Sequence, residues 1–339
     1  MTAAIISFTE DGRVVSEKIA SEIGCAVRFC FHKHSDENAE KFTDLPSLTA
    51  EIFDRYDAFV FVSSVGIAVR AVAPHIRSKT TDPAVVAVDD SGKFAVSVLS
   101  GHLGGANALA KEIAEIVGAV PVITTATDTH GLFSPDVFAK ANGLAICDMK
   151  AAKAVAAALL NGEKVGLRCK YPHSGVPAGI TECDSGNIGI CVSENADEKP
   201  FDTTLNLLPK NLVAGIGCKK ETSSDSITEH ILCVFSDNNL DIRRLSAVAT
   251  IDIKSEEPGL IGFCRRFELP LKTFTADELM SAQGSFTHSD FVEKTTGADN
   301  VCERAAVCAG GSVIVPKTAQ NGVTAAVAEL PVYIDFEKE

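Results

Sequence analysis

The first third of the chain alternates between short apolar runs and longer amphipathic runs. Six runs rich in Val, Ile and Phe predict β-strands, namely AAIISF, CAVRFCF, DAFVFVS, AVVAVD, KFAVSVL and VPVITT. Helical patterns separate most of them, at residues 13–23, 45–55, 65–75 and 105–117. Because parallel strands need a long crossover, this alternation predicts a mainly parallel sheet with helices on both faces. The short segment DSG within VDDSGKF predicts one hairpin and therefore one antiparallel pair.

A second α/β pattern opens at NLVAGIGC and closes with strands on either side of QNG. Between the two patterns lie alanine-rich helices at 137–160 and the strand-like runs KVGLRCK and NIGICVS. A chain of 339 residues is long enough for two or three domains. We therefore expect an α/β protein in which a small α+β domain joins two α/β domains, with boundaries at 1–130, 131–210 and 211–339.

The distribution of charge bears on the partners of the protein. A formal net charge of −14 argues against nucleic acid, which needs a basic surface. Two stretches are nevertheless poor in acids: the segment between Asp57 and Asp82, which holds Arg70, Arg77 and Lys79, and the segment 149–181. These stretches predict either a site for a polycarboxylate or a chance clustering of bases on solvated faces.

Cysteine usage and hydropathy indicate the compartment. The eleven cysteines are scattered, mostly inside apolar runs, which is typical of small buried side chains in a reducing environment. No apolar run reaches the roughly 18–20 residues of a membrane-spanning helix, and the start of the chain lacks a basic leader. We expect a cytoplasmic protein without a membrane partner.

Several common motifs are absent from the sequence. It contains no G-x-S-x-G and no P-loop, and GIGCKKE has Lys220 where a dinucleotide fingerprint needs its third glycine. The segment CAVRFCFHKH lacks a second ligand pair at zinc spacing, so we expect no metal site. The stretch SGHLGGANAL instead joins a strand to a helix through glycines, which lets backbone N–H groups face an anion.

Longer strings give a more specific signal. SSVGIAVRAVAPHIRSKTTDPAVVAVDD, SGKFAVSVLSGHLGGANALAKEIAEI, VATIDIKSEEPGLIGF, FTHSDFVEKTTGADNVCERAAVCAGG and PKTAQNGVTAAVAEL resemble, in order, the cobalt-precorrin-5A hydrolase family of anaerobic cobalamin biosynthesis. Two positions depart from that pattern: Glu221 replaces a usual glycine, and His130 replaces a frequent asparagine. The resemblance implies a hydrolase that opens the δ-lactone of cobalt-precorrin-5A, releasing acetaldehyde and giving cobalt-precorrin-5B.

The resemblance and the residues together give candidate roles. His102 is a candidate general base, because the unperturbed pKa of an imidazole is about 6.5, and Asp128 either orients it or is itself the base. The amides of Gly104 and Gly105, with the Asn107 side chain, are candidates for an oxyanion hole. Thr125 completes the catalytic set, at the carboxyl end of the strand where α/β sheets bind ligands. The alternative is that His102 only caps the helix, that Asn107 is an ordinary first-turn residue and that Asp128 forms a turn.

Other candidates lie near these residues or in the C-terminal strings. The expected substrate-binding residues are Gly101, Gly104, Gly105, Arg70, Arg77, Lys79, Thr124, Gly215, Gly217, Lys220, Glu257, Ser289 and Glu303. Ser289 is equally typical of a helix N-cap.

The resemblance also implies the partners. The substrates are a cobalt corrinoid and water, the cobalt enters as part of the corrinoid, and no further cofactor is expected. A homodimer and contacts with neighbouring corrin-pathway methyltransferases are compatible with it. The alternative function is a corrinoid-binding or transfer protein of the same pathway that cleaves nothing.

Overall fold

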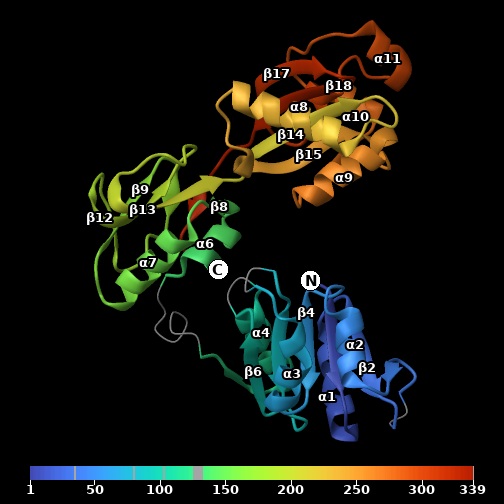
Figure 1. Ribbon diagram of the computed structural model, residues 1–339, viewed down its shortest axis with the longest axis vertical. Helices are drawn as coiled ribbons and strands as arrows, with labels where there is room; N and C mark the ends of the chain where they lie inside the picture. The colour runs from blue at the N-terminus through green and yellow to red at the C-terminus, as the bar shows by residue number, and fades with distance from the viewer. Residues whose placement is uncertain (34–35, 79–80, 102–103, 125–132, 339) are drawn as a thin grey trace. The chain divides into compact units, whose positions relative to one another are not determined.

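The computed structural model describes residues 1–33, 36–78, 81–101, 104–124 and 133–338. The chain forms two compact units, Met1–Val137 and Phe138–Glu339 (Figure 1). No helix within these described ranges is long and apolar enough to cross a membrane. Each unit is described by itself.

The first unit is built on one seven-stranded sheet in the order β3-β2-β1-β4-β5-β6-β7. The strands are β1 (Ala3–Ser7), β2 (Ala26–Phe31), β3 (Glu40–Phe42), β4 (Ala58–Val62), β5 (Ala84–Val88), β6 (Phe94–Leu99) and β7 (Val120–Val122). Strands β1 to β5 are parallel, β6 is antiparallel to β5, and β7 is parallel to β6. The predicted hairpin therefore reverses the last two strands of the sheet.

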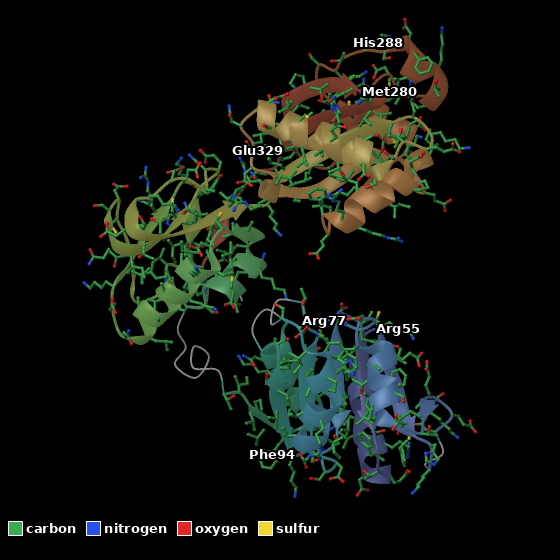
Figure 2. All side chains as sticks on the ribbon, in the orientation of Figure 1. Arg55, Arg77, Phe94, Met280, His288 and Glu329 are labelled. Atoms are coloured by element: carbon green, nitrogen blue, oxygen red, sulfur yellow. The ribbon has the colours of Figure 1, made fainter. Side chains whose placement is uncertain are left out.

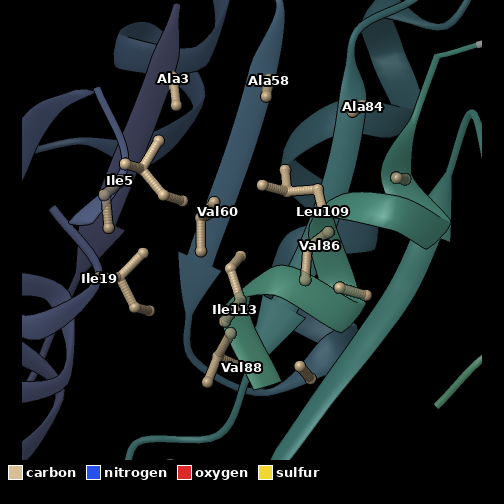
Figure 3. Close-up of a cluster of buried hydrophobic side chains, with 14 of the residues drawn as sticks. Ala3, Ile5, Ile19, Ala58, Val60, Ala84, Val86, Val88, Leu109 and Ile113 are labelled. Carbon is tan, nitrogen blue, oxygen red and sulfur yellow. The ribbon is translucent and has the colours of Figure 1, made fainter. Parts of the chain in front are cut away.

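Helices cover both faces of this sheet. They are α1 (Glu10–Glu22), α2 (Leu45–Ile52), α3 (Val65–Val72), continued by the 3-10 turn η1 (Ala73–His75), and α4 (Ala106–Val117). Aliphatic side chains of β1, β4 and β5 pack against α1 and α4 on one face, as Figure 3 shows for Ile5, Val60 and Leu109. The other face, under α2 and α3, is rich in phenylalanine. Helix α1 begins three residues before its predicted start because the Thr9 hydroxyl caps it, accepting the Gly12 N–H at 3.0 Å.

The second unit begins with a five-stranded sheet in the order β11-β9-β12-β13-β8, which is parallel except for the last pair. Its elements are α6 (Pro135–Ala141), β8 (Leu144–Ile146), α7 (Met149–Leu160), β9 (Val165–Cys169), β11 (Ile180–Glu182), β12 (Gly186–Val192) and β13 (Phe201–Pro209). Helix α6 starts just before the boundary between the two units and continues into the second. Helices α6 and α7 cover most of the alanine-rich segment 137–160, which the sequence predicts to be helical.

The C-terminal sheet has the order β16-β15-β14-β18-β17. Its strands are β14 (Leu212–Cys218), β15 (Leu245–Ile251), β16 (Leu271–Phe274), β17 (Ser312–Gln320) and β18 (Val323–Glu329). The helical segments are α8 (Ser224–Asp237), η2 (Ile242–Arg244), η3 (Asp252–Lys254), α9 (Pro258–Arg266), α10 (Ala276–Ser281), α11 (Asp290–Thr296) and α12 (Cys302–Cys308). Helices α8 and α9 pack on one face of the sheet, and α10 and α12 pack on the other.

After β18 the chain returns to the middle module. Strand β19 (Ile334–Asp335) pairs in parallel with β10 (His173–Ser174). The Phe336 ring stacks on Phe138 with 4.4 Å between centroids. Residues near the end of the chain therefore complete the fold of the middle module. A hydrogen bond between Asn142 and Asp335, which are 193 positions apart, shows this directly.

The α/β class and the mainly parallel sheets are confirmed. The strands β3, β8, β10, β11 and β19 were not predicted, because two or three residues carry too little periodicity. The nine-residue strand β13 was also not predicted. The three domain boundaries stay a prediction.

Candidate functional site

The reversal of β6 decides which edge of the first sheet carries the predicted site. Since β6 and β7 are parallel to each other, the glycine loop after β6 and Thr124 after β7 emerge at one edge, as expected. Because β6 is antiparallel to β5, this is the edge where β1, β4 and β5 begin, not where they end. Gly101 and Thr124 therefore follow the carboxyl ends of β6 and β7 but lie at the edge of the amino ends of β1, β4 and β5, and a site at this edge stays a prediction. Figure 2 shows Arg77 and Phe94 at opposite edges.

The usual ligand position of an open α/β sheet lies at the other edge. Helix α1, which follows β1, packs on one face, and α3, which follows β4, packs on the other. The carboxyl ends of β1 and β4 thus form a topological switch point, where such sheets commonly bind ligands. Thr9 caps α1 there with its hydroxyl, and Ser64 occupies the N-cap position of α3 without a side-chain hydrogen bond to that helix. The first unit accordingly has two distinct edges that an activity measurement can distinguish.

A hydrogen-bond network ties the glycine loop to the segment before β5. The backbone N–H groups of Arg77 and Ser78 donate to the Asp82 carboxylate at 2.9 and 3.0 Å. The Ser100 hydroxyl donates to the backbone carbonyl of Asp82 at 3.0 Å. Ser100 itself has φ +56°, a left-handed conformation that is costly without glycine. The start of the loop is therefore fixed by the neighbouring strand.

The basic residues at this edge are less free than their sequence context predicted. The Arg77 side chain is 65% exposed and its two terminal nitrogens pair with the Asp54 carboxylate at 3.0 and 2.9 Å. This hydrogen-bonded ion pair raises the pKa of Arg77. Arg70 is exposed on α3, with its guanidinium lying near Gly66. The segment between Asp57 and Asp82 contains no acid, but in the fold its Arg77 pairs with Asp54 from the segment before it.

The three glycines of the loop are required for three different reasons. A Cβ on Gly101 would lie 2.7 Å from Oδ1 of Asn107, and a Cβ on Gly104 would lie 2.3 Å from the Cβ of Ser100. Gly105, the N-cap of α4, has φ +86°, which favours glycine for conformational reasons alone. Gly101 and Gly104 therefore lie too close to Asn107 and Ser100 to carry a side chain without a shift of the structure.

Asn107, in the first turn of α4, is buried beside Gly101. Its side chain is 6% exposed, and its Oδ1 accepts the Ser97 hydroxyl at 2.6 Å. Its backbone N–H donates to the Gly101 carbonyl at 2.9 Å, and the Ala106 N–H donates to the Ser100 carbonyl at 3.1 Å. Sequence reasoning missed Ser97. The available signal was a polar residue two positions after Ala95, on the strand side where an apolar residue is expected.

Four predicted residues, His102, Lys79, Thr125 and Asp128, lie outside the described residues, and their roles stay predictions. Thr124 is described and exposed.

In the C-terminal sheet, two predicted glycines mark close packing. A Cβ on Gly215 would lie 1.8 Å from the backbone oxygen of Cys302, and one on Gly217 would lie 2.6 Å from the Thr324 hydroxyl oxygen. These glycines let α12 and the side chains of β18 approach β14 closely. Their observed contacts are within the protein.

Glu257 joins the loops after β14 and β15. Its side chain is 8% exposed, and its carboxylate accepts the Glu221 N–H at 2.6 Å and the Lys254 ammonium at 2.8 Å. The hydrogen bond from Lys254 lowers the pKa of Glu257, and the charge of Lys220 adds to the effect. Glu221 has φ +62°, so the position that usually holds glycine needs a left-handed backbone.

Glu303 and Ser289 lie on the α12 side of this sheet. The Glu303 carboxylate is 3% exposed and accepts N–H groups of Thr287 at 2.7 Å and Lys317 at 2.8 Å. It also accepts the Asn300 side-chain amide at 2.5 Å. Ser289 occupies the N-cap position of α11, without a side-chain hydrogen bond to that helix. Glu303 thus joins the loop before α11, the start of α12 and strand β17.

One group in the described part of the chain brings three candidate metal ligands together. The ligand atoms of His288, Asp290 and Glu293 lie within 4.8 Å of one another, and all three side chains are exposed. His288 pairs with Asp290 at 2.8 Å, which raises the pKa of the imidazole. An ion pair accounts for this cluster, and the absence of a metal cofactor stays a prediction.

Family models match three successive parts of the chain. They are described as Cobalamin synthesis G N-terminal at residues 47–128, Cobalamin biosynthesis central region at 133–209 and Cobalamin synthesis G C-terminus at 212–328.

Individual proteins match over nearly the full length. The cobalt-precorrin-5A hydrolase of Salmonella typhimurium is 33% identical over 95% of each chain. That of Priestia megaterium is 29% identical over 97% of this chain and 95% of the relative. A crystal structure of a cobalamin biosynthesis protein G homologue from Sulfolobus solfataricus covers 97% of both chains at 25% identity, with a TM-score of 0.43. The chain belongs to the cobalt-precorrin-5A hydrolase family.

Proposed function

We propose that this protein is a cobalt-precorrin-5A hydrolase, which opens the δ-lactone of its substrate and releases acetaldehyde. The names of its relatives support the activity. The structural observation behind the choice of site is the parallel pairing of β6 with β7, which brings Gly101, after β6, and Thr124, after β7, to one edge. The cobalt belongs to the substrate, and the protein needs no cofactor of its own in this proposal.

The chemistry asks for a base, oxyanion donors and a grip on the corrinoid. Water adds to the lactone carbonyl, a negative charge develops on the carbonyl oxygen, and the ring C–O bond breaks to leave a carboxylate and a hydroxyl. Loss of the hydroxyl proton then lets the C–C bond between the two-carbon fragment and the macrocycle break; the fragment leaves as acetaldehyde, and the macrocycle takes the electron pair and a proton. We assign the base to His102 or Asp128, because an imidazole titrates near neutral pH and a carboxylate can orient it. Thr125 is also a proposed catalytic residue. The amides of Gly104 and Gly105, with the Asn107 side chain, are the proposed oxyanion donors, each worth about 3 kcal/mol in comparable sites.

The substrate carries acetate and propionate groups, which need cationic partners. Arg70, Arg77 and Lys79 come from the same segment before β5, and Arg77 and Arg70 are exposed. A substrate carboxylate can replace Asp54 on the Arg77 guanidinium, since the pair is solvated and the geometry is already bidentate. Thr124 is a further contact at this edge. In the C-terminal sheet the proposed substrate contacts are Gly215, Gly217, Lys220, Glu257, Ser289 and Glu303, and the charge of Lys220 acts on the Glu257 carboxylate.

The setting of the reaction is part of the proposal. Its support is the eleven scattered cysteines, which fit a reducing cytoplasm, and all eleven thiols are free in the structure. We also keep a homodimer and contacts with corrin-pathway methyltransferases as proposed associations.

The test is anaerobic incubation of the purified protein with cobalt-precorrin-5A and an assay for acetaldehyde. We expect release by the wild-type protein and a loss of about a hundredfold or more in His102→Ala or Asp128→Asn. Tight corrinoid binding without acetaldehyde would identify a carrier and contradict the proposal.

A further inference from the structure

We propose that Lys317 binds a carboxylate of the corrinoid through its ammonium group, which makes it a substrate-binding residue supplied by the C-terminal sheet. The inference rests on the proposed function, because the corrinoid is the substrate of that reaction. Lys317 lies on β17, the outer strand of the sheet (Figure 1). A corrinoid with acetate and propionate groups needs cations that the acids of the protein do not already neutralise.

A β-bulge sets the direction of Lys317. The register with β18 shifts between Val315 and Thr318, so two residues of β17 oppose one residue of β18 there. The two residues are Pro316, which has no N–H to donate, and Lys317. Bulges turn a side chain out of the regular alternation of a strand, and they are common next to active sites. The orientation of Lys317 is therefore built into the fold of the strand.

A buried carboxylate fixes the backbone of this bulge. The N–H of Lys317 donates to Oε1 of Glu303 at 2.8 Å. The same carboxylate accepts the N–H and the hydroxyl of Thr287 at 2.7 and 3.2 Å, and Glu303 is 3% exposed. Hydrogen bonds to a charged carboxylate are strong, so Lys317 and Thr287 are held close to each other. Because Thr287 is exposed, this place is open to the solvent.

The ammonium of Lys317 has no anionic partner in the part of the chain that the structure describes. No described carboxylate lies within ion-pair distance of it, although the side chain is partly buried. Lys254, the other partly buried lysine of this sheet's module, is paired with Glu257 at 2.8 Å. Lysines are rarely removed from water unless they are paired. The unpaired charge of Lys317 is therefore available to an anionic ligand.

This charge acts on the side of the sheet that carries α12. Burial raises the pKa of Cys302, the first residue of that helix, to about 11, and the Thr324 hydroxyl and the Lys317 charge oppose the rise. The predicted substrate contacts Ser289 and Glu303 lie on the same side, and neither carries a positive charge. Lys317 thus supplies the cation that a substrate carboxylate needs at this place.

The experiment measures the affinity of wild type, Lys317→Gln, Lys317→Arg and Lys272→Gln for dicyanocobyrinic acid, a cobalt corrin with free carboxylates, and for its methyl ester, which has none. Lys317→Gln should weaken binding of the acid about tenfold, because one charge-assisted hydrogen bond is lost, and should leave binding of the ester unchanged. Lys317→Arg should keep most of the affinity, because it keeps the charge. Both variants keep the backbone N–H that Glu303 accepts, so the bulge is retained.

Lys272→Gln is the matched control, because Lys272 is an exposed lysine on β16, the outer strand at the other end of the sheet. It should bind the acid as wild type does. Equal affinity of wild type and folded Lys317→Gln for the acid, an equal loss for acid and ester, or no binding of the acid by wild type would overturn the contact. Binding that depends on Lys317, without acetaldehyde release from cobalt-precorrin-5A by wild type, would contradict hydrolysis and leave the contact in place.

Discussion

Asn142 and Asp335 hydrogen-bond to each other twice across 193 residues of chain. The Asn142 side-chain amide donates to the Asp335 carbonyl at 2.8 Å, and the Asp335 N–H donates to Asn142 Oδ1 at 2.8 Å. This pair lies beside the pairing of β10 with β19 and the stack of Phe336 on Phe138. The end of the chain is therefore an integral part of the middle module.

Replacing Asn142 by alanine should destabilise the second unit by about 1–2 kcal/mol, because two backbone groups of Asp335 lose their partner. Urea unfolding of the full chain measures the change. Tyr333→Ser is the control, since this side chain lies in the same terminal segment and is 60% exposed. Equal effects of the two substitutions would mean that the hydrogen bonds contribute nothing specific.

Gly215→Ala should destabilise the C-terminal sheet by about 3 kcal/mol or more, because the new Cβ would collide with the backbone of Cys302. Thermal unfolding of the variant checks this. Gly186→Ala is the matched control, since its Cβ would meet Phe201 at an ordinary 3.6 Å. A stable Gly215→Ala variant with weakened corrinoid binding would favour a substrate contact at Gly215 over a packing role.

The stability of the second unit should depend on pH through Glu257. The Lys254 hydrogen bond lowers the pKa of this carboxyl below its usual value of about 4.5. The stabilisation is therefore complete above that value and is lost as the pH falls through the lower pKa of the folded state. Glu257→Gln should cost about 1.5–3 kcal/mol at pH 7 and show a shallower loss of Tm between pH 6 and 3. Parallel pH profiles for wild type and variant would exclude this role.

Local chemistry made much of the fold predictable. The apolar runs of the first third correspond to β1, β2, β4, β5, β6 and β7, and the QNG segment forms a two-residue turn in which Asn321 and Gly322 have φ of +51° and +82°. Strands and turns of this kind can be predicted because the residues that determine them lie within a few positions of one another in the sequence.

Long-range consequences were not predictable in the same way. The pairing of Arg77 with Asp54 and of Asn142 with Asp335 depends on which segments the sheets bring together. The predicted hairpin already implied that the loop after β6 lies at the edge where β5 begins, and the strand order adds which other strands lie beside it. Ser97 was missed because its partner lies ten residues away on another element.

The most direct measurement is the rate of anaerobic acetaldehyde release from cobalt-precorrin-5A by wild type, Thr124→Val and Ser64→Ala. Both side chains are exposed, so neither substitution disturbs the core, and they lie at opposite edges of the first sheet. We expect release by wild type, a decrease of about tenfold in Thr124→Val, and an unchanged rate in Ser64→Ala. No release by wild type, or a decrease confined to Ser64→Ala, would contradict hydrolysis at the edge formed by the ends of β6 and β7.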